Sequence, residues 1–267
     1  MQSEGLDESY RPLSNHGRKL STKELDCEPA PLVGSEATEF RAKAARANFL
    51  ASDRPDIVFA VKELCRGMSS PTDRDAAALK RLASYLLGRP RLLLHYAWQA
   101  GAKVFEVFSD GDEAGSIRTR ESTSGGALMR GSHVLKTWCG TQGTVALSSA
   151  EAELIAAVRG AAEGLSARSL AWDLGSECGV NVHIDSSAAL GICKRTGIGK
   201  IRHLDTRLLW IQDLVRNGTL NVMKVAGEVN PGDLMTKHLA ADVISEHLVR
   251  LSCWPREGRA RSAPKCA

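Results

Sequence analysis

The pattern of apolar and polar residues changes near residue 100, from purely helical to mixed. Between residues 39 and 96, apolar residues recur every three or four positions, for example in IVFAVKELCRGM (57–68). PTDRDAAALKRLASYLLG (71–88) begins with a proline and a capping threonine and ends at a glycine, as helices do. We therefore expect a small helical module here. Residues 1–38 are polar and without periodicity, which predicts a disordered or linker lead-in.

From residue 102 onward the pattern predicts strands as well as helices. Short apolar and β-branched runs bounded by Gly and Ser are typical of strands, and longer stretches with apolar residues at helical spacing are typical of helices. The order βββαβααβα indicates an α/β architecture, a mixed five-stranded sheet with flanking helices. The predicted strands are 104–110, 122–132, 133–141, 180–185 and 219–227, and the predicted helices are 148–175, 186–195, 203–218 and 230–251.

Two of the predicted strands end in an aspartate. VFEVFSD ends at Asp110, and VNVHID ends at Asp185 and is followed by SSAAL. An Asp followed by two Ser residues is also a common helix start, so capping alone would explain Asp185. However, sites in open α/β sheets form at the carboxyl ends of strands. Because the first and fourth strands can lie side by side in the sheet centre, we expect Asp110 and Asp185 to be neighbours.

Two carboxylates held close together in a partly buried place repel each other, and a divalent cation removes that repulsion. Mg²⁺ takes oxygen ligands and keeps several waters, so it needs few protein carboxylates. Glu153 lies beside the apolar face of the helix 148–175, and Asp233 opens the last predicted helix. Each is an ordinary helix residue when taken singly. The joint pattern favours a metal site formed by Asp110, Glu153, Asp185 and Asp233.

Composition excludes several classes of protein. The chain is 43% hydrophobic and 25% charged, as globular proteins are, and no apolar run is long enough to span a bilayer. The N-terminal residues show no signal-peptide pattern. The 7 cysteines are scattered without a CxxC pair, which predicts neither a zinc site nor a disulfide framework, and indicates reduced thiols in an intracellular compartment.

The ordered motifs FSDGDEAG…RESTSGG, SSAEAEL, IDSSAALGI and NPGDLMTKHL resemble the ribonuclease H domain of copia-type (Pseudoviridae-like) LTR retrotransposon Pol polyproteins. The preceding ASDRPDIVFAV…MSSPT…ALKRLASYLLG resembles the stretch that joins reverse transcriptase to ribonuclease H in the same elements. The resemblance covers roughly residues 39–245 and implies a ribonuclease H-like fold. The implied parts are a remnant of the reverse transcriptase C-terminal or connection region over 39–97, a ribonuclease H-like domain over 102–246 and a basic tail over 247–267.

The resemblance also implies an activity, the metal-dependent hydrolysis of the RNA strand of RNA–DNA hybrids. Two Mg²⁺ ions, for which Mn²⁺ would substitute, would be bridged by Asp110, with Glu153 and Asp185 holding one ion and Asp233 the other. The implied partners are the RNA–DNA hybrid and the polymerase part of the same polyprotein, without a small-molecule cofactor or a membrane. The implied location is cytoplasmic, in a virus-like particle, or nuclear.

A basic stretch between residues 194 and 207 is the other candidate for substrate contact. The net charge of +4 is a weaker indication, because the last eighteen residues account for it. Side chains in this stretch would contact backbone phosphates, or they form a solvated loop face; the sequence leaves both open. His203 is expected to be structural or to contact phosphate. The candidates are Lys194, Arg195, Lys200, Arg202, His203 and Arg207.

The chain departs from the family pattern in three places. It contains no Tyr-x-Asp-Asp sequence, so the polymerase active site is missing. The loop AGEVNPG lacks the histidine of cellular ribonucleases H, and Leu209 stands where copia-type elements usually have a second histidine. One alternative is therefore a catalytically silent, domesticated or decayed fragment that keeps the fold and binds nucleic acid. A DNA-cutting transferase of the integrase type is disfavoured, because Glu153 precedes the fourth strand rather than following the fifth.

Overall fold

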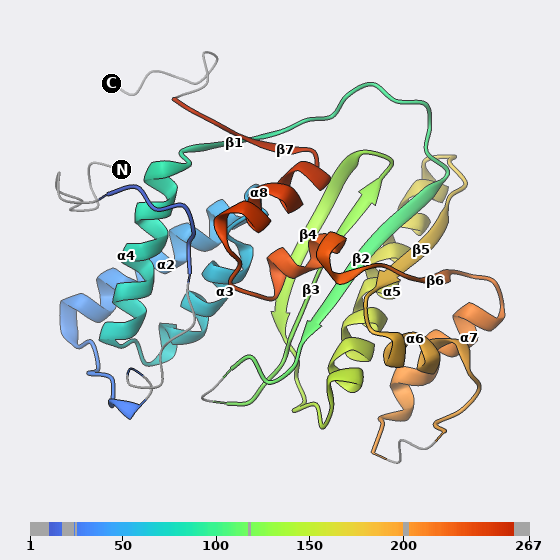
Figure 1. Ribbon diagram of the computed structural model, residues 1–267, viewed down its shortest axis with the longest axis horizontal. Coiled ribbons are helices and arrows are strands. Elements are labelled where there is room, and N and C mark those ends of the chain that lie inside the picture. Colours follow the sequence, from blue (N-terminus) through green and yellow to red (C-terminus); the bar gives the residue numbers. More distant parts are fainter. Residues whose placement is uncertain (1–10, 18–23, 25, 117–118, 200–202, 259–267) are drawn as a thin grey trace. The chain divides into compact units, whose positions relative to one another are not determined.

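The computed structural model describes residues 11–17, 24, 26–116, 119–199 and 203–258 (Figure 1). Contacts within the chain divide it into two compact units. One unit holds His95–Lys237 and Arg250–Ser252. The other holds the described residues up to Leu94, His238–Val249 and the described residues from Cys253 onward. Among the described residues, no helix has both the length and the apolar character needed to cross a membrane.

The unit around residues 95–237 is built on a 5-stranded sheet with the order β4-β3-β2-β5-β6. The central strand β2 pairs antiparallel with β3 and parallel with β5, and β5 pairs parallel with β6. This mixed sheet has the order and directions of the ribonuclease H-like fold, so the expected fold class is confirmed. The strands are β2 (Val104–Asp112), β3 (Thr123–Arg130), β4 (His133–Thr141), β5 (Gly179–Ile184) and β6 (Asn221–Lys224).

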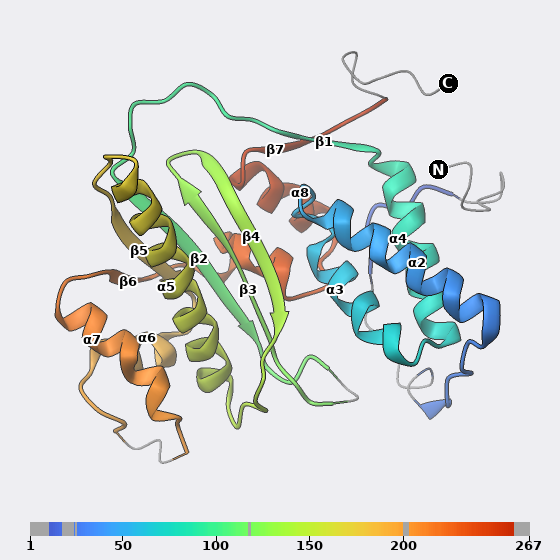
Figure 2. The same cartoon turned by 180° about the vertical axis from the view of Figure 1, so that it is seen from behind.

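A long helix, α5 (Ser149–Asp173), covers one face of this sheet; it lies behind the sheet in Figure 1 and in front of it in Figure 2. Its first turn is capped by Ser148, whose side chain accepts a hydrogen bond from the backbone N–H of Glu151. Small residues dominate its buried side, which lets the helix approach the sheet closely. The shorter helices α6 (Ser187–Lys194) and α7 (Trp210–Arg216) complete this layer. Burial of Val107, Leu154 and Ile184 marks the core between sheet and helices.

The other unit is mainly helical. A capping box opens α4, in which the backbone N–H of Thr72 donates to Asp75 Oδ2 over 2.8 Å. The core forms around Phe40, Ile57 and Tyr85. The elements are α2 (Gly34–Ala51), α3 (Val58–Arg66), η2 (Gly67–Ser69), α4 (Asp73–Gly88), β1 (Arg91–Leu94), α8 (Ala241–Arg250) and β7 (Cys253–Arg256).

The structure corrects several sequence predictions. The helix expected over 203–218 starts as the 3-10 segment η3 (Thr206–Leu209), and the helix expected over 230–251 is interrupted. The 3-10 segment η4 (Gly227–Val229) precedes this range, η5 (Pro231–Met235) lies within it, and a regular helix begins only at Ala241. Pro and Gly at the start of η5 favour the tight turn over a longer helix.

Strands β1 and β7 were not expected. They pair antiparallel with each other, Arg91 opposite Arg256 and Leu94 opposite Cys253. Within the segment 247–267, interpreted as a basic tail, the end of α8 and the whole of β7 occupy the chain to Arg256. Likewise, the lead-in expected over 1–38 ends earlier, since α2 begins at Gly34. The remaining domain boundaries stay predictions.

Candidate metal centre

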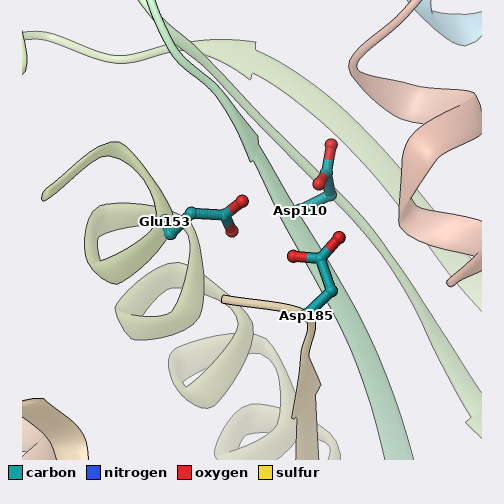
Figure 3. Close-up of side chains that lie close together, drawn as sticks. All are labelled: Asp110, Glu153 and Asp185. Carbon is teal, nitrogen blue, oxygen red and sulfur yellow. The ribbon is translucent and has the colours of Figure 1, made fainter. Parts of the chain in front are cut away.

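Three carboxylates from three elements converge at one end of the sheet. Asp110 lies near the end of β2, Glu153 in the first turns of α5, and Asp185 directly after β5. One oxygen from each lies within 4.8 Å of the other two, and Figure 3 shows the side chains pointing toward one another. The expected neighbourhood of Asp110 and Asp185 is therefore confirmed. It follows from the parallel pairing of β2 with β5, in which Phe108 lies opposite His183, two residues before each aspartate.

Glu153 reaches this group because α5 lies against the end of β2. The backbone N–H of Gly111 donates a hydrogen bond to Glu153 Oε2 over 3.2 Å. A Cβ atom at position 111 would lie 2.6 Å from the carbonyl oxygen of Ala152, too close for any side chain. The glycine between Asp110 and Asp112 is thus what permits the helix to approach. Glu151, two residues earlier, is not part of the group and accepts a hydrogen bond from the backbone N–H of Leu147.

The fourth predicted carboxylate, Asp233, lies in η5 and is not one of the three mutually close groups. It is connected to them through Lys237. The Lys237 Nζ atom lies 2.9 Å from Asp233 Oδ1 and 3.3 Å from Asp110 Oδ1. The structure therefore brings three predicted ligands together directly and the fourth through a lysine that the sequence analysis did not single out.

Hydrogen bonds fasten η5 to the central strand. The buried Asn230 donates from Nδ2 to the carbonyl oxygen of Ser109 over 3.0 Å and accepts from the backbone N–H of Gly232 over 3.1 Å. The Thr236 hydroxyl donates to Asp110 Oδ2. These contacts hold Asp233 and Lys237 beside Asp110, so the arrangement of the site is set by the fold.

The carboxylates destabilise one another's charged forms. Burial raises the pKa of Glu153 to about 9, with further contributions from the charges of Asp110 and Asp185. Burial and Asp110 also raise the pKa of Asp185, and they raise the pKa of Asp233 to about 6. For Lys237, burial opposes the charged form, but the carboxylates of Asp110 and Asp233 outweigh it and raise the pKa. The group thus brings several carboxylates together, and Lys237 is the lysine that contacts two of them directly.

This donor set suits a divalent cation. The three converging groups offer oxygen atoms, the ligands that hard cations such as Mg²⁺ and Mn²⁺ prefer. No cysteine or histidine belongs to the group, so within the described residues it does not have the character of a zinc site. Repulsion between close carboxylates is the condition that a bound cation relieves.

The predicted basic stretch is mostly engaged in local contacts. Arg195 donates to the carbonyl oxygen of Ile198, and Arg207 Nη2 lies 2.7 Å from Asp205 Oδ2. His203 Nε2 lies 3.5 Å from Glu151 Oε2. Lys194 is exposed at the end of α6. Two further predicted residues, Lys200 and Arg202, lie outside the described residues.

Sequence reasoning missed four residues that shape the site. Lys224 donates from its ammonium to the carbonyl oxygen of Asp185, which places a second positive charge beside the group. Thr236 and Lys237 follow Asp233 by three and four positions, a spacing that brings side chains together on a helical turn and could have identified them. No sequence pattern identified Asn230, because the carbonyl group of Ser109 that it binds is 121 residues away in the sequence.

Similar proteins are polyproteins of plant transposons. The chain is 30% identical over 186 residues to the retrovirus-related Pol polyprotein from transposon TNT 1-94 of Nicotiana tabacum, an alignment that covers 69% of the chain. It is 28% identical over 213 residues, 77% of the chain, to that from transposon RE1 of Arabidopsis thaliana. The chain spans about 14% of the length of either relative. No family model matches the chain.

Solved structures similar to this chain are ribonucleases H. Ribonuclease H1 LC11, isolated from compost, aligns with a TM-score of 0.41 at 15% identity and covers 50% of this chain and 93% of its own. Ribonuclease H1 of Halobacterium salinarum aligns with a TM-score of 0.37 at 15% identity, over 49% of this chain and 93% of its own.

Proposed function

Because the chain belongs to the copia-type retrovirus-related Pol polyproteins, we propose that it is their ribonuclease H part and hydrolyses the RNA strand of RNA–DNA hybrids. The observation that carries this proposal is the convergence of Asp110, Glu153 and Asp185 at the carboxyl ends of β2 and β5. Without a cation, a cluster of this kind disfavours the folded state when it is ionised, because burial and the neighbouring carboxylates raise the cost of ionising each group. It is explained by a cation that the three groups hold together.

The residues of the chain would act by holding, orienting and neutralising. Asp110, Glu153 and Asp185 would hold one divalent cation, Mg²⁺ or Mn²⁺, and Asp110 with Asp233 a second. When bound, such cations lower the pKa of water and neutralise charge on a phosphate that is being cleaved. Asp110 is kept in orientation by the Thr236 hydroxyl, and Glu153 by the Gly111 N–H, so neither has to reorganise for the reaction.

Substrate selection would depend on shape rather than on base sequence. Ribonucleic acid differs from DNA by its 2′-hydroxyl groups and by its groove dimensions, which protein side chains can read. Positive side chains, Lys224 beside Asp185 and the exposed Lys194 at the end of α6, would contact backbone phosphates and position the hybrid. The polymerase part of the polyprotein is the proposed partner in holding the hybrid.

A catalytically silent fragment that keeps the fold and binds nucleic acid is the competing function. The engagement of Arg195 and Arg207 in local contacts favours neither proposal, because both need a phosphate-binding surface. An integrase-type transferase is not favoured, since Glu153 lies on α5, which precedes β5. Of the ribonuclease and the silent fragment, only the ribonuclease needs the carboxylates as metal ligands.

Cleavage of a labelled RNA–DNA hybrid separates these functions. We expect the wild-type chain to cut the RNA strand only with Mg²⁺ or Mn²⁺, and Asp185→Asn to abolish cutting. Asp213→Asn makes the same change beside Arg216 on α7, outside the carboxylate group, and should cut as wild type does. A wild-type chain that binds hybrid without cutting it in either cation would establish the silent fragment instead.

A further inference from the structure

Lys237 occupies a position between two of the proposed metal ligands. Its ammonium contacts Asp233 Oδ1 at 2.9 Å and Asp110 Oδ1 at 3.3 Å. The side chain of Asp110 is 0% exposed and that of Asp233 is 17% exposed, whereas that of Lys237 is 36% exposed. A positive charge thus lies between two largely buried carboxylates while its own stem reaches the surface.

The four proposed ligands are therefore not equivalent. Asp110, Glu153 and Asp185 converge on one another, whereas the ammonium of Lys237 donates hydrogen bonds to Asp110 and Asp233. The oxygen atoms of Asp110 and Asp233 already have a cation, the ammonium of Lys237. Two cations cannot share that position, because like charges a few ångströms apart repel strongly.

Resting on the proposed function, we propose that Lys237 is a positioning residue, a built-in counter-ion that a second divalent cation must displace. The first cation then binds Asp110, Glu153 and Asp185 without moving the lysine. The second binds between Asp110 and Asp233 only when the ammonium leaves them. The long, flexible side chain of Lys237, which is 36% exposed, allows that departure.

Counting bound Mn²⁺ tests this inference without nucleic acid. We titrate the full chain with Mn²⁺, follow free Mn²⁺ by electron paramagnetic resonance, and compare wild type with Lys237→Gln and Lys237→Arg. We expect two binding events in wild type, with the second strengthened about tenfold or more in Lys237→Gln and unchanged in Lys237→Arg, which keeps the charge. Lys136→Gln removes an exposed lysine that pairs with Glu163 at 2.6 Å and should leave both events unchanged.

The outcomes separate this inference from the proposed function. A second event of the same strength in wild type and Lys237→Gln overturns the role of Lys237 and leaves the metal-dependent function standing. Failure of the wild-type chain to bind Mn²⁺ at all overturns the proposed function, and this inference with it.

A second measurement uses the unaltered chain, because Lys237→Gln removes the counter-charge of the fully buried Asp110 and can prevent folding. Acetic anhydride acetylates free lysine ammonium groups after deprotonation, and mass spectrometry locates the acetyl groups. We expect acetylation of Lys237 to increase severalfold at Mn²⁺ concentrations that fill the second position, while acetylation of Lys136 stays constant. Equal acetylation of Lys237 with and without Mn²⁺ would show that the ammonium is not displaced.

Discussion

The backbone N–H of Gly111 donates a hydrogen bond to Oε2 of Glu153, with 3.2 Å between nitrogen and oxygen. The contact joins the middle of the candidate site to the helix that carries its glutamate. It exists because α5 approaches β2 so closely that position 111 has no space for a Cβ atom. The strand end and the helix start therefore form one local structure, on which the position of Glu153 depends.

Gly111→Ala should destabilise the protein and weaken cation binding together. The added methyl group would lie 2.6 Å from the carbonyl oxygen of Ala152, and backbone cannot yield as a flexible side chain can. Overpacking of this kind costs about 1–3 kcal/mol. Urea denaturation measures the loss, and Mn²⁺ titration measures the effect on the site.

The matched control is Gly191→Ala in α6, where the added Cβ meets no atom within 4 Å beyond the adjoining residues and backbone of its own helix. This change should stabilise the chain by up to about 1 kcal/mol, because alanine is the better helix former. If Gly111→Ala were as stable as wild type and bound Mn²⁺ equally well, α5 would not depend on close approach at this position.

Without cations, the stability of the sheet-containing unit should fall as pH rises from about 5 to about 9. This range lies between the pKa of Glu153 in the unfolded chain and its pKa in the folded chain. Its pKa is raised from 4.5 to about 9 in the folded chain, so the folded state holds a proton that the unfolded chain has lost. The stabilisation is fully present below the unfolded pKa and is lost as pH rises through the folded pKa, at up to about 1.4 kcal/mol per pH unit. Asp185 and Asp233 act in the same direction.

Thermal unfolding of wild type and Glu153→Gln between pH 5 and 9 checks this dependence. The glutamine variant should show a shallower pH slope and greater stability than wild type at pH 9 without cations. Mg²⁺ should stabilise wild type most at high pH, where the carboxylates are ionised, and should stabilise the variant less. Parallel slopes for the two chains would contradict the raised pKa.

The sequence was sufficient for the sheet and for the neighbourhood of Asp110 and Asp185. Both follow from alternating apolar runs and from strands that end in carboxylates, which are local patterns. The sequence was insufficient for elements and side chains whose contacting residues lie far away along the chain. Strands β1 and β7 have four residues each and pair across the chain, so neither has a pattern of its own. Lys237 and Asp110 are 127 residues apart in the sequence, so their contact could be recognised only in the folded structure.

A buried ion pair should control the stability of the helical unit. Asp56, which is 0% exposed, accepts hydrogen bonds from Arg54 Nε at 2.9 Å, Arg54 Nη2 at 2.7 Å and the Tyr85 hydroxyl at 2.8 Å. Asp56→Ala leaves the buried guanidinium unpaired and should cost about 3–5 kcal/mol. Tyr85→Phe removes one hydrogen bond to a charged group and should cost about 1.5–3 kcal/mol.

Urea denaturation of the full chain measures both losses. Asp53→Ala is the control, because Asp53 is exposed in the same loop and its replacement should change stability by no more than about 0.5 kcal/mol. If Asp56→Ala lost no more than this control, the Arg54–Asp56 pair would not support the packing of the unit.

Among the described basic candidates, Lys194 should contribute more to hybrid binding than Arg207. The guanidinium of Arg207 already contacts Asp205 Oδ2 at 3.0 Å through Nε and at 2.7 Å through Nη2, so a phosphate would have to compete with that carboxylate. Lys194 is exposed at the end of α6. Lys194→Gln should therefore weaken binding. It should also reduce the slope of log affinity against log salt concentration by about the amount that one phosphate contact contributes.

Fluorescence anisotropy with a labelled hybrid, measured over a range of salt concentrations, checks this order. Arg207→Gln should have the smaller effect, and Asp205→Asn should strengthen binding, because it releases the Arg207 guanidinium for phosphate. Equal losses for Lys194→Gln and Arg207→Gln would mean that the ion pair with Asp205 breaks when the hybrid binds. No loss for Lys194→Gln would place the phosphate-binding surface elsewhere, with Lys224 beside Asp185 as the next residue to replace.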